Sequence, residues 1–191
     1  MRDFVLNEWL TPILLISCAY ILSFFMTFAI VMPVQDAILP AFGNFASLLF
    51  LPHGVRVVSA WLYGWRSPIF LVPGSILSHS YLFGSAGFSV DYLMAAFFGV
   101  YCAAFSFWLF ALCGMDLRLH KTDNVHWRDV MLAGVVASIL NSVGRTFFLG
   151  NDLATAAALF IGDVTGMFAS MFLLMVGFRL ARRKAGRSGA E

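Results

Sequence analysis

The sequence predicts an all-α protein, a polytopic membrane bundle of six transmembrane helices. Three observations lead to this prediction. Of the 191 residues, 61% are hydrophobic and only 12% are charged, which is about half the charged fraction of a typical soluble domain. The apolar residues fall into runs that are long enough to cross a bilayer. Finally, the basic residues are distributed very unevenly among the connections between these runs.

The predicted helices follow one another with short connections. The first apolar run follows a short polar segment and exceeds the length of a signal-peptide core, so we interpret it as a retained helix. Polar residues and prolines from Pro33 to Pro40 predict the first turn, and Pro68 suits an early position of the third helix. That helix is short and contains Pro73, whereas the fourth is rich in phenylalanine. The predicted spans are 9–34, 41–65, 69–83, 91–114, 129–148 and 153–179, in one transmembrane domain over residues 1–191 with a basic cytoplasmic tail at 180–191.

The second span carries residues that hydrocarbon disfavours. Pro52, His53, Gly54 and Arg56 lie at the centre of an otherwise apolar segment. Proline removes a backbone donor, glycine loosens a helix, and a buried guanidinium is costly without a partner. We therefore expect this helix to be broken or kinked at Pro52–Gly54. Two half-helices that meet in the middle of the membrane are the alternative.

The positive-inside rule supports the count of six spans. Six crossings place both termini on one side, and the three opposite connections contain Asp36, Asp91 and Asp152 but no basic residue. We therefore expect both termini to be cytoplasmic, with the basic tail near anionic membrane lipid. The basic residues on that side are Arg2, Arg66, Arg118, Lys121, Arg128, Arg179, Arg182, Arg183, Lys184 and Arg187.

The two remaining basic residues and one acid fall inside the predicted spans. At about 1.5 Å per residue, Asp163 lies roughly 15 Å into its helix, near the middle of a hydrocarbon core about 30 Å thick. Arg56 reaches a comparable depth, and Arg145 lies nearer the outer end of its helix. Histidines and an asparagine lie on the same faces or at a similar depth. We predict a polar cluster in the bundle, formed by His53, Arg56, His79, Asn141, Arg145 and Asp163.

The charges of this cluster do not balance. The economical arrangement pairs Asp163 with Arg56 or Arg145, and it leaves one positive charge that the carboxylate or phosphate of a small ligand could neutralise. Two structural alternatives stay open. The first is an Arg56–Asp163 ion pair that only fixes helix packing, and the second is an Arg145 side chain that extends to the outer surface. Because ionisable residues inside membranes are often functional, ligand or partner binding is the leading hypothesis.

Small residues are expected to serve packing and bending. Gly162 and Gly166 have the small-xxx-small spacing of a helix-packing groove. Pro52, Gly54 and Gly64 are candidate hinge residues on the second span.

Nothing in the sequence predicts catalysis. The chain has one deep acid and no paired aspartates, H-E-x-x-H motif or serine–histidine arrangement at a suitable spacing. Its three cysteines lie in apolar runs without C-x-x-C spacing. We expect a non-enzymatic protein that uses no cofactor or metal and binds no nucleic acid.

Two motifs carry a family resemblance. The segment Phe50–Pro68 and the run Phe160–Gly166 resemble motifs of the bacterial membrane-associated sensor domains of the first type. The matching positions are Pro52, Gly54, Gly64, Arg66 and Pro68, followed by Gly162, Asp163 and Gly166. That family usually has about eight helices and precedes histidine kinases or diguanylate cyclases. This chain is shorter, has Leu51 before the first motif and shows no output domain, so the resemblance implies a stand-alone sensory module.

The leading functional hypothesis is therefore a sensory protein of the bacterial inner membrane. It would bind a small anionic ligand or a partner membrane protein at the predicted polar cluster. One alternative is an accessory or assembly subunit of a larger membrane complex. Another is a small-solute transporter or the substrate-binding membrane component of one.

Overall fold

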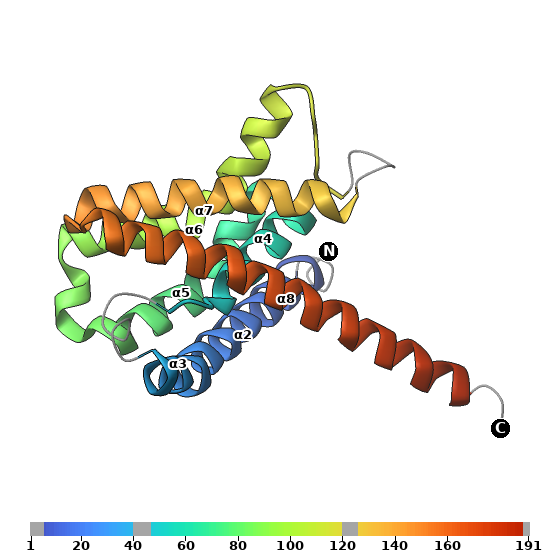
Figure 1. Ribbon diagram of the computed structural model, residues 1–191. Coiled ribbons are helices and arrows are strands. Elements are labelled where there is room, and N and C mark those ends of the chain that lie inside the picture. Colours follow the sequence, from blue (N-terminus) through green and yellow to red (C-terminus); the bar gives the residue numbers. More distant parts are fainter. Residues whose placement is uncertain (1–5, 40–46, 120–125, 189–191) are drawn as a thin grey trace.

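The computed structural model describes residues 6–39, 47–119 and 126–188, and all regular elements in these ranges are helical (Figure 1). The all-α prediction is thereby confirmed for this part of the chain. The elements are η1 (Leu6–Leu10), α2 (Thr11–Met26), η2 (Thr27–Val31), α3 (Met32–Ile38), α4 (Leu51–Tyr63), η4 (Gly64–Arg66), α5 (Ser67–Phe83), η5 (Gly84–Phe88), α6 (Val90–Leu112), α7 (Trp127–Leu149) and α8 (Leu153–Ser188).

Within the part of the chain that the structure describes, five helical stretches are long and apolar enough to cross a membrane. They cover Glu8–Ile38, Leu51–Phe88, Val90–Leu112, Trp127–Leu149 and Leu153–Leu180. Four of the six predicted spans each correspond to one of these stretches, whereas the second and third, 41–65 and 69–83, both overlap Leu51–Phe88. The second predicted span, 41–65, corresponds only to α4 among the described residues. With 13 residues, α4 is about 20 Å long, too short to cross a hydrocarbon core of about 30 Å by itself. Residues 41–46 of that span lie outside the described residues.

The first helix extends further than the sequence suggested. Instead of turning at Pro33, the chain stays helical to Ile38, and Pro33 occupies the first turn of α3 after the π-helical turn η2. A proline in a first turn costs no hydrogen bond, because those backbone N–H groups have no partner within the helix anyway. Pro40, the last residue of the predicted turn, lies outside the described residues.

The predicted break in the second helix lies a few residues earlier than Pro52. Residues Ser47–Phe50 are not helical, and α4 starts at Leu51 with Pro52 in its first turn. Pro52 therefore begins the helix rather than kinking it, and Gly54 is an ordinary helical residue. Gly64 ends α4 with a positive φ of 55°, a conformation that favours glycine.

Helix α4 lies at the centre of the bundle and contacts α2, α5, α6, α7 and α8. Most of its residues are buried, and Val57 and Ala60 pack into the main core with Phe107, Ala133 and Met167. Helix α8 packs against α4 and α7, and its C-terminal part leaves the bundle, as Figure 1 shows. The helix reaches Ser188, so most of the predicted tail at 180–191 continues α8, while 189–191 lie outside the described residues.

Asp152 caps the start of α8 and gives the fold a local pH dependence. Its Oδ1 accepts a hydrogen bond of 2.9 Å from the backbone N–H of Thr155, and hydrogen bonding to Thr155 lowers the pKa of the Asp152 carboxyl. A lowered pKa means that the cap stabilises the fold above the pKa of an unfolded aspartate and that this is lost as the pH falls through the folded pKa.

We expect Asp152→Ala to lower the melting temperature at pH 7, because the N-terminal N–H groups of α8 lose an acceptor. The gap to the wild type should narrow as the pH falls below about 4. Thermal unfolding of both proteins, followed by circular dichroism from pH 7 to pH 3, measures this gap. An equal gap at every pH would contradict the capping role.

Candidate functional site

The non-helical segment Ser47–Phe50 is bound along α8. The backbone N–H of Phe50 donates to the carbonyl of Gly162 at 2.8 Å. The hydroxyl of Thr165 donates to the carbonyl of Leu48, and that of Ser170 donates to the carbonyl of Leu51 at 3.0 Å. Helix α8 thus provides both donors and an acceptor for the backbone that precedes α4.

The first helix supplies the remaining partners of this segment. Thr27 Oγ1 accepts from the backbone N–H of Leu51 at 3.2 Å, and Gln35 Oε1 accepts from that of Leu48 at 2.7 Å. Non-helical backbone is tolerated at membrane depth only where such groups are satisfied by protein or water. The sequence analysis did not single out Thr27, Gln35 or Thr165, because a lone polar residue in an apolar helix gives no sign of its partner.

Gly162 and Gly166 allow the segment to lie directly on α8. A Cβ atom on Gly162 would overlap the carbonyl oxygen of Ser47, and one on Gly166 would overlap that of Phe50. Both obstacles are backbone atoms, so no side-chain rotation would relieve them. The predicted packing groove at Gly162 and Gly166 therefore contacts the non-helical segment Ser47–Phe50 rather than another helix. Gly54 has a related position, because its Cβ would overlap the side chain of Ser170.

Asp163 on α8 joins two other helices through Asn141 and His53. Asn141 Nδ2 donates to Asp163 Oδ2 at 2.5 Å, and His53 Nδ1 lies 3.5 Å from the same oxygen. The other ring nitrogen of His53 lies 3.0 Å from Ser138 Oγ and 3.3 Å from the carbonyl oxygen of Gly134. The Asp163 side chain is 3% exposed and that of His53 is fully buried. These contacts tie together α4, α7 and α8.

Arg56 is almost fully buried yet only partly hydrogen-bonded. Its residue is 5% exposed, and Nη2 donates to the hydroxyl of Tyr20 at 2.7 Å. The guanidinium carbon lies 5.5 Å from the ring centres of both Tyr20 and Phe50. Nε and Nη1 have no hydrogen-bond partner among the described residues. Gly99 leaves room for the group, since a Cβ there would come within 3.3 Å of Nη2.

The structure differs from the expectation that Asp163 pairs with an arginine. Within the described residues, no ion pair within 4.0 Å joins Asp163 to Arg56 or Arg145. The half-buried Arg145 also has a buried Nε without a hydrogen-bond partner. Asn141 and His53 contact Oδ2 of Asp163 instead, and both guanidinium groups line the same cavity as the acid.

A cavity of about 340 Å³ connects most of the predicted cluster. Five of the six predicted residues line it, and His53 lies behind Asp163 instead. Apolar side chains, including those of Phe24, Phe28 and Leu159, cover the rest of the wall. The polar residues of the lining are Tyr20, Ser47, Arg56, Ser75, Ser78, His79, Asn141, Arg145 and Asp163.

His79 lines the cavity from α5. Its Nε2 lies 2.8 Å from the carbonyl oxygen of Gly87, and its ring centre is 4.9 Å from that of Phe83. Ser75 and Ser78 precede it on α5, and the hydroxyl of Ser78 has no hydrogen-bond partner. The sequence analysis missed both serines. Ser75 lies three residues before Ser78 and four before His79, and this spacing marks one polar helix face.

The arrangement is suited to recognition. The cavity combines two guanidinium groups, several hydroxyl groups and one carboxylate that is already hydrogen-bonded. Within the described residues, no group of three His, Cys, Asp or Glu side chains could hold a metal ion.

No protein family model matches the chain, and no curated protein or solved structure is significantly similar to it.

Proposed function

We propose that this protein is a receptor of the bacterial inner membrane that binds a small ligand through an anionic group, without catalysing a reaction. The observation that carries the proposal is the Arg56 side chain. It is buried beside a cavity, and its Nε and Nη1 donors have no hydrogen-bond partner in the part of the chain that the structure describes. Buried donors are normally satisfied, and an unpaired buried guanidinium is especially costly. A bound anion would supply the missing acceptor.

The charge of the cavity favours an anion over a neutral ligand. Arg56 and Arg145 contribute two positive charges, while Asp163 contributes one negative charge. With a neutral His53, one positive charge remains. The volume of about 340 Å³ falls at the small end of the usual range for ligand sites, about 300–1,000 Å³.

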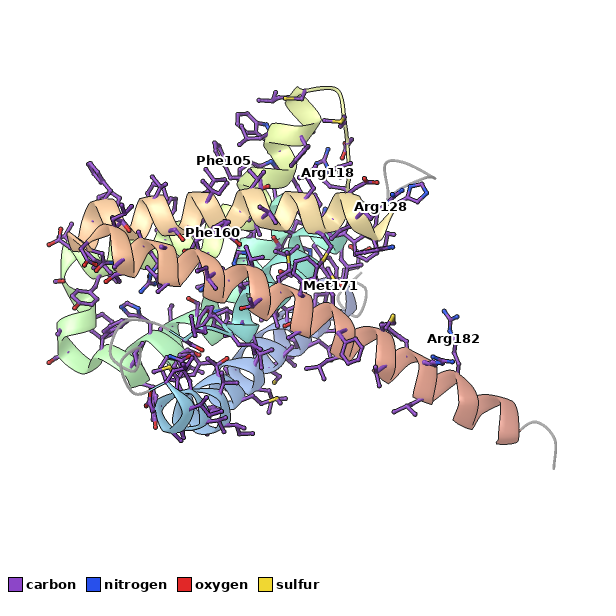
Figure 2. All side chains as sticks on the ribbon, viewed as in Figure 1. Phe105, Arg118, Arg128, Phe160, Met171 and Arg182 are labelled. Carbon is purple, nitrogen blue, oxygen red and sulfur yellow. The ribbon has the colours of Figure 1, made fainter. Side chains whose placement is uncertain are left out.

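We also propose six crossings with both termini cytoplasmic. The contacts around α4 support this topology: the Arg66 guanidinium lies 5.2 Å from the ring centre of Trp9, and Leu119 N donates to the carbonyl of Trp61 at 3.2 Å. The start of the first helix, the end of α4 and the connection after α6 therefore share one end of the bundle. Figure 2 shows Arg118 and Arg128 at this end. In this topology α4 belongs to the second crossing.

We infer a sensory role because α8 both lines the cavity and continues out of the bundle. The wall of the cavity includes residues of α2, α4, α5, α7 and α8, and α8 continues out of the bundle towards Arg182 (Figure 2). A ligand that changes how α8 packs against Ser47–Phe50 would move the exposed end of α8. The resemblance to membrane-associated sensor domains supports the same role. A partner membrane protein would then read this change.

Transport is a second candidate, supported by a specific feature. A short helix that starts inside the membrane after a non-helical segment is typical of secondary transporters, and α4 has this form. Flux of a bound anion across the membrane of proteoliposomes would favour the transporter. Binding without flux would favour the receptor.

We expect Arg56→Gln to weaken anion binding about 10- to 100-fold, because hydrogen bonds to charged groups contribute about 1.5–3 kcal/mol. The protein in phosphatidylcholine nanodiscs is titrated with butanoate, inorganic phosphate and dodecanoate, and its melting temperature is measured. At least one anion should stabilise the wild type. Arg128→Gln is the control, because Arg128 is exposed at the start of α7. A wild type that responds to none of the three, or an Arg56→Gln variant that responds normally, would overturn the proposal.

A further inference from the structure

A second, mostly apolar groove lies directly beside the charged cavity. It has a volume of about 210 Å³ and runs between α5, η5 and the first half of α6. Several of its side chains are exposed on the outside of the bundle, among them Ile76, Phe88 and Phe97. In a membrane this surface faces lipid. The apolar lining consists mainly of Val72, Ile76, Phe88, Leu93, Phe97 and Tyr101.

The groove and the cavity share a wall. Ser75, His79 and Ala96 line both spaces. Ser75 and Ala96 have the smallest of these side chains. The ring of His79 contacts the carbonyl of Gly87 through Nε2. The boundary between a lipid-facing groove and a buried charged site is therefore only one layer of mostly small side chains.

We propose that the ligand is a single-chain anionic amphiphile that enters from the bilayer between α5 and α6. Its anionic group lies at Arg56 and Arg145, and its hydrocarbon chain lies in the groove. This inference rests on the proposed function, since it assumes that the cavity binds an anion.

The charges and dimensions of the two spaces fit such a molecule. One uncompensated positive charge matches a monoanion such as a carboxylate. The groove extends from Leu93 to Tyr101 along α6, which is about 12 Å at 1.5 Å per residue. Among the described residues its lining contains no Asp, Glu, Lys or Arg and is mostly apolar, so a hydrocarbon chain keeps most of its apolar contacts when it moves from lipid into the groove.

The bilayer also explains why a hydrocarbon chain would help. A short anion must leave water and reach a site near the middle of the membrane, which is costly for a charge. An amphiphile is already concentrated in the membrane, because each methylene contributes about 0.8 kcal/mol to its partition from water. The chain thus raises the local concentration of the anionic group beside the shared wall.

The test uses a fatty acid with a diazirine in its hydrocarbon chain, photo-crosslinked to the full-length protein in phosphatidylcholine nanodiscs. Labelled residues are located by mass spectrometry. We expect labels on the groove residues of α5 and α6, and competition by dodecanoate at a concentration at least about 10-fold lower than by butanoate. Ala96→Leu, which thickens the shared wall, should reduce this labelling about 10-fold. Ala157→Leu is the matched control, because Ala157 is exposed on α8 and lines neither space.

The outcomes distinguish the proposed entry of an amphiphile through the groove from the proposed anion receptor. Labels spread evenly over the exposed faces of α2, α6 and α8, or equal labelling in Ala96→Leu and Ala157→Leu, would overturn entry through the groove. Equal competition by butanoate and dodecanoate would overturn the amphiphile and leave the anion receptor standing. Labelling that neither competitor reduces and that Arg56→Gln leaves unchanged would overturn both. If Ala96→Leu does not fold, Phe97→Ala replaces it, because it removes an exposed side of the groove and should also reduce labelling.

Discussion

Replacing Gly166 by alanine is expected to destabilise the protein by about 3 kcal/mol, at the upper end of typical overpacking costs. The added Cβ would overlap the carbonyl oxygen of Phe50. That carbonyl cannot move away easily, because the neighbouring backbone is hydrogen-bonded to Gly162 and Ser170. The bundle must therefore separate α8 from the segment before α4, or lose these hydrogen bonds.

Gly177 on the same helix provides the matched control. A Cβ there meets no atom within 4 Å, so Gly177→Ala should be neutral or stabilising by up to about 1 kcal/mol, through the better helix propensity of alanine. Unfolding of both variants in mixed micelles, followed by circular dichroism, measures the difference. Equal stabilities would show that Ser47–Phe50 does not lie on α8 as described.

The second large effect is expected at Asp163. Asp163→Leu removes the acid that lies among Arg56, Arg145 and His53, and it leaves Asn141 without an acceptor. Breaking a buried charge arrangement by removing one member typically costs about 3–5 kcal/mol. Asp163→Asn, which keeps the size and an acceptor oxygen, should cost less. Chemical unfolding of the two variants in micelles gives both values.

A control variant and the response to anions distinguish an electrostatic effect of Asp163 from lost packing. Asp91 is exposed in the first turn of α6, so Asp91→Asn should change stability by no more than about 0.5 kcal/mol. Anions that bind the more positive cavity should partly restore the stability of Asp163→Leu. A variant that is as stable as the wild type, or that gains nothing from anions that stabilise the wild type, would contradict the electrostatic role of Asp163.

The parts of the fold that could be predicted depend on local sequence. Long apolar runs indicated both ends of α6 and α7 and the start of α8 to within a few residues, because length and hydropathy decide whether a helix can cross a bilayer. The end of α8 at Ser188 lies well past the predicted end at 179. The second span could not be predicted in detail. Pro52 suits both a kink and a first turn, and the difference depends on whether the preceding backbone finds partners elsewhere. Those partners, Gly162 and Thr165, lie more than a hundred residues later in the chain.

The candidate site shows the same limit. Counting residues from the helix ends placed Arg56 and Asp163 at similar depth, and the structure brings both to one cavity. Which residues contact Asp163, here Asn141 and His53, depends on how each helix is rotated about its axis. The depth of a residue in the membrane does not give this rotation. Tyr20, which binds Arg56, lies in an apolar run, where an aromatic residue normally indicates only packing.

The attachment of Ser47–Phe50 to α8 has a consequence for biogenesis. During synthesis, α4 emerges before its acceptor helix exists, and 13 residues cannot span the bilayer by themselves. Thr27 and Gln35 of the first helix are already present and can accept from the backbone before α4. The hydrogen bonds to Gly162, Thr165 and Ser170 form only when α8 has been inserted. Because Asp163 on α8 lines the charged cavity, the cavity is also complete only after α8 has joined the bundle.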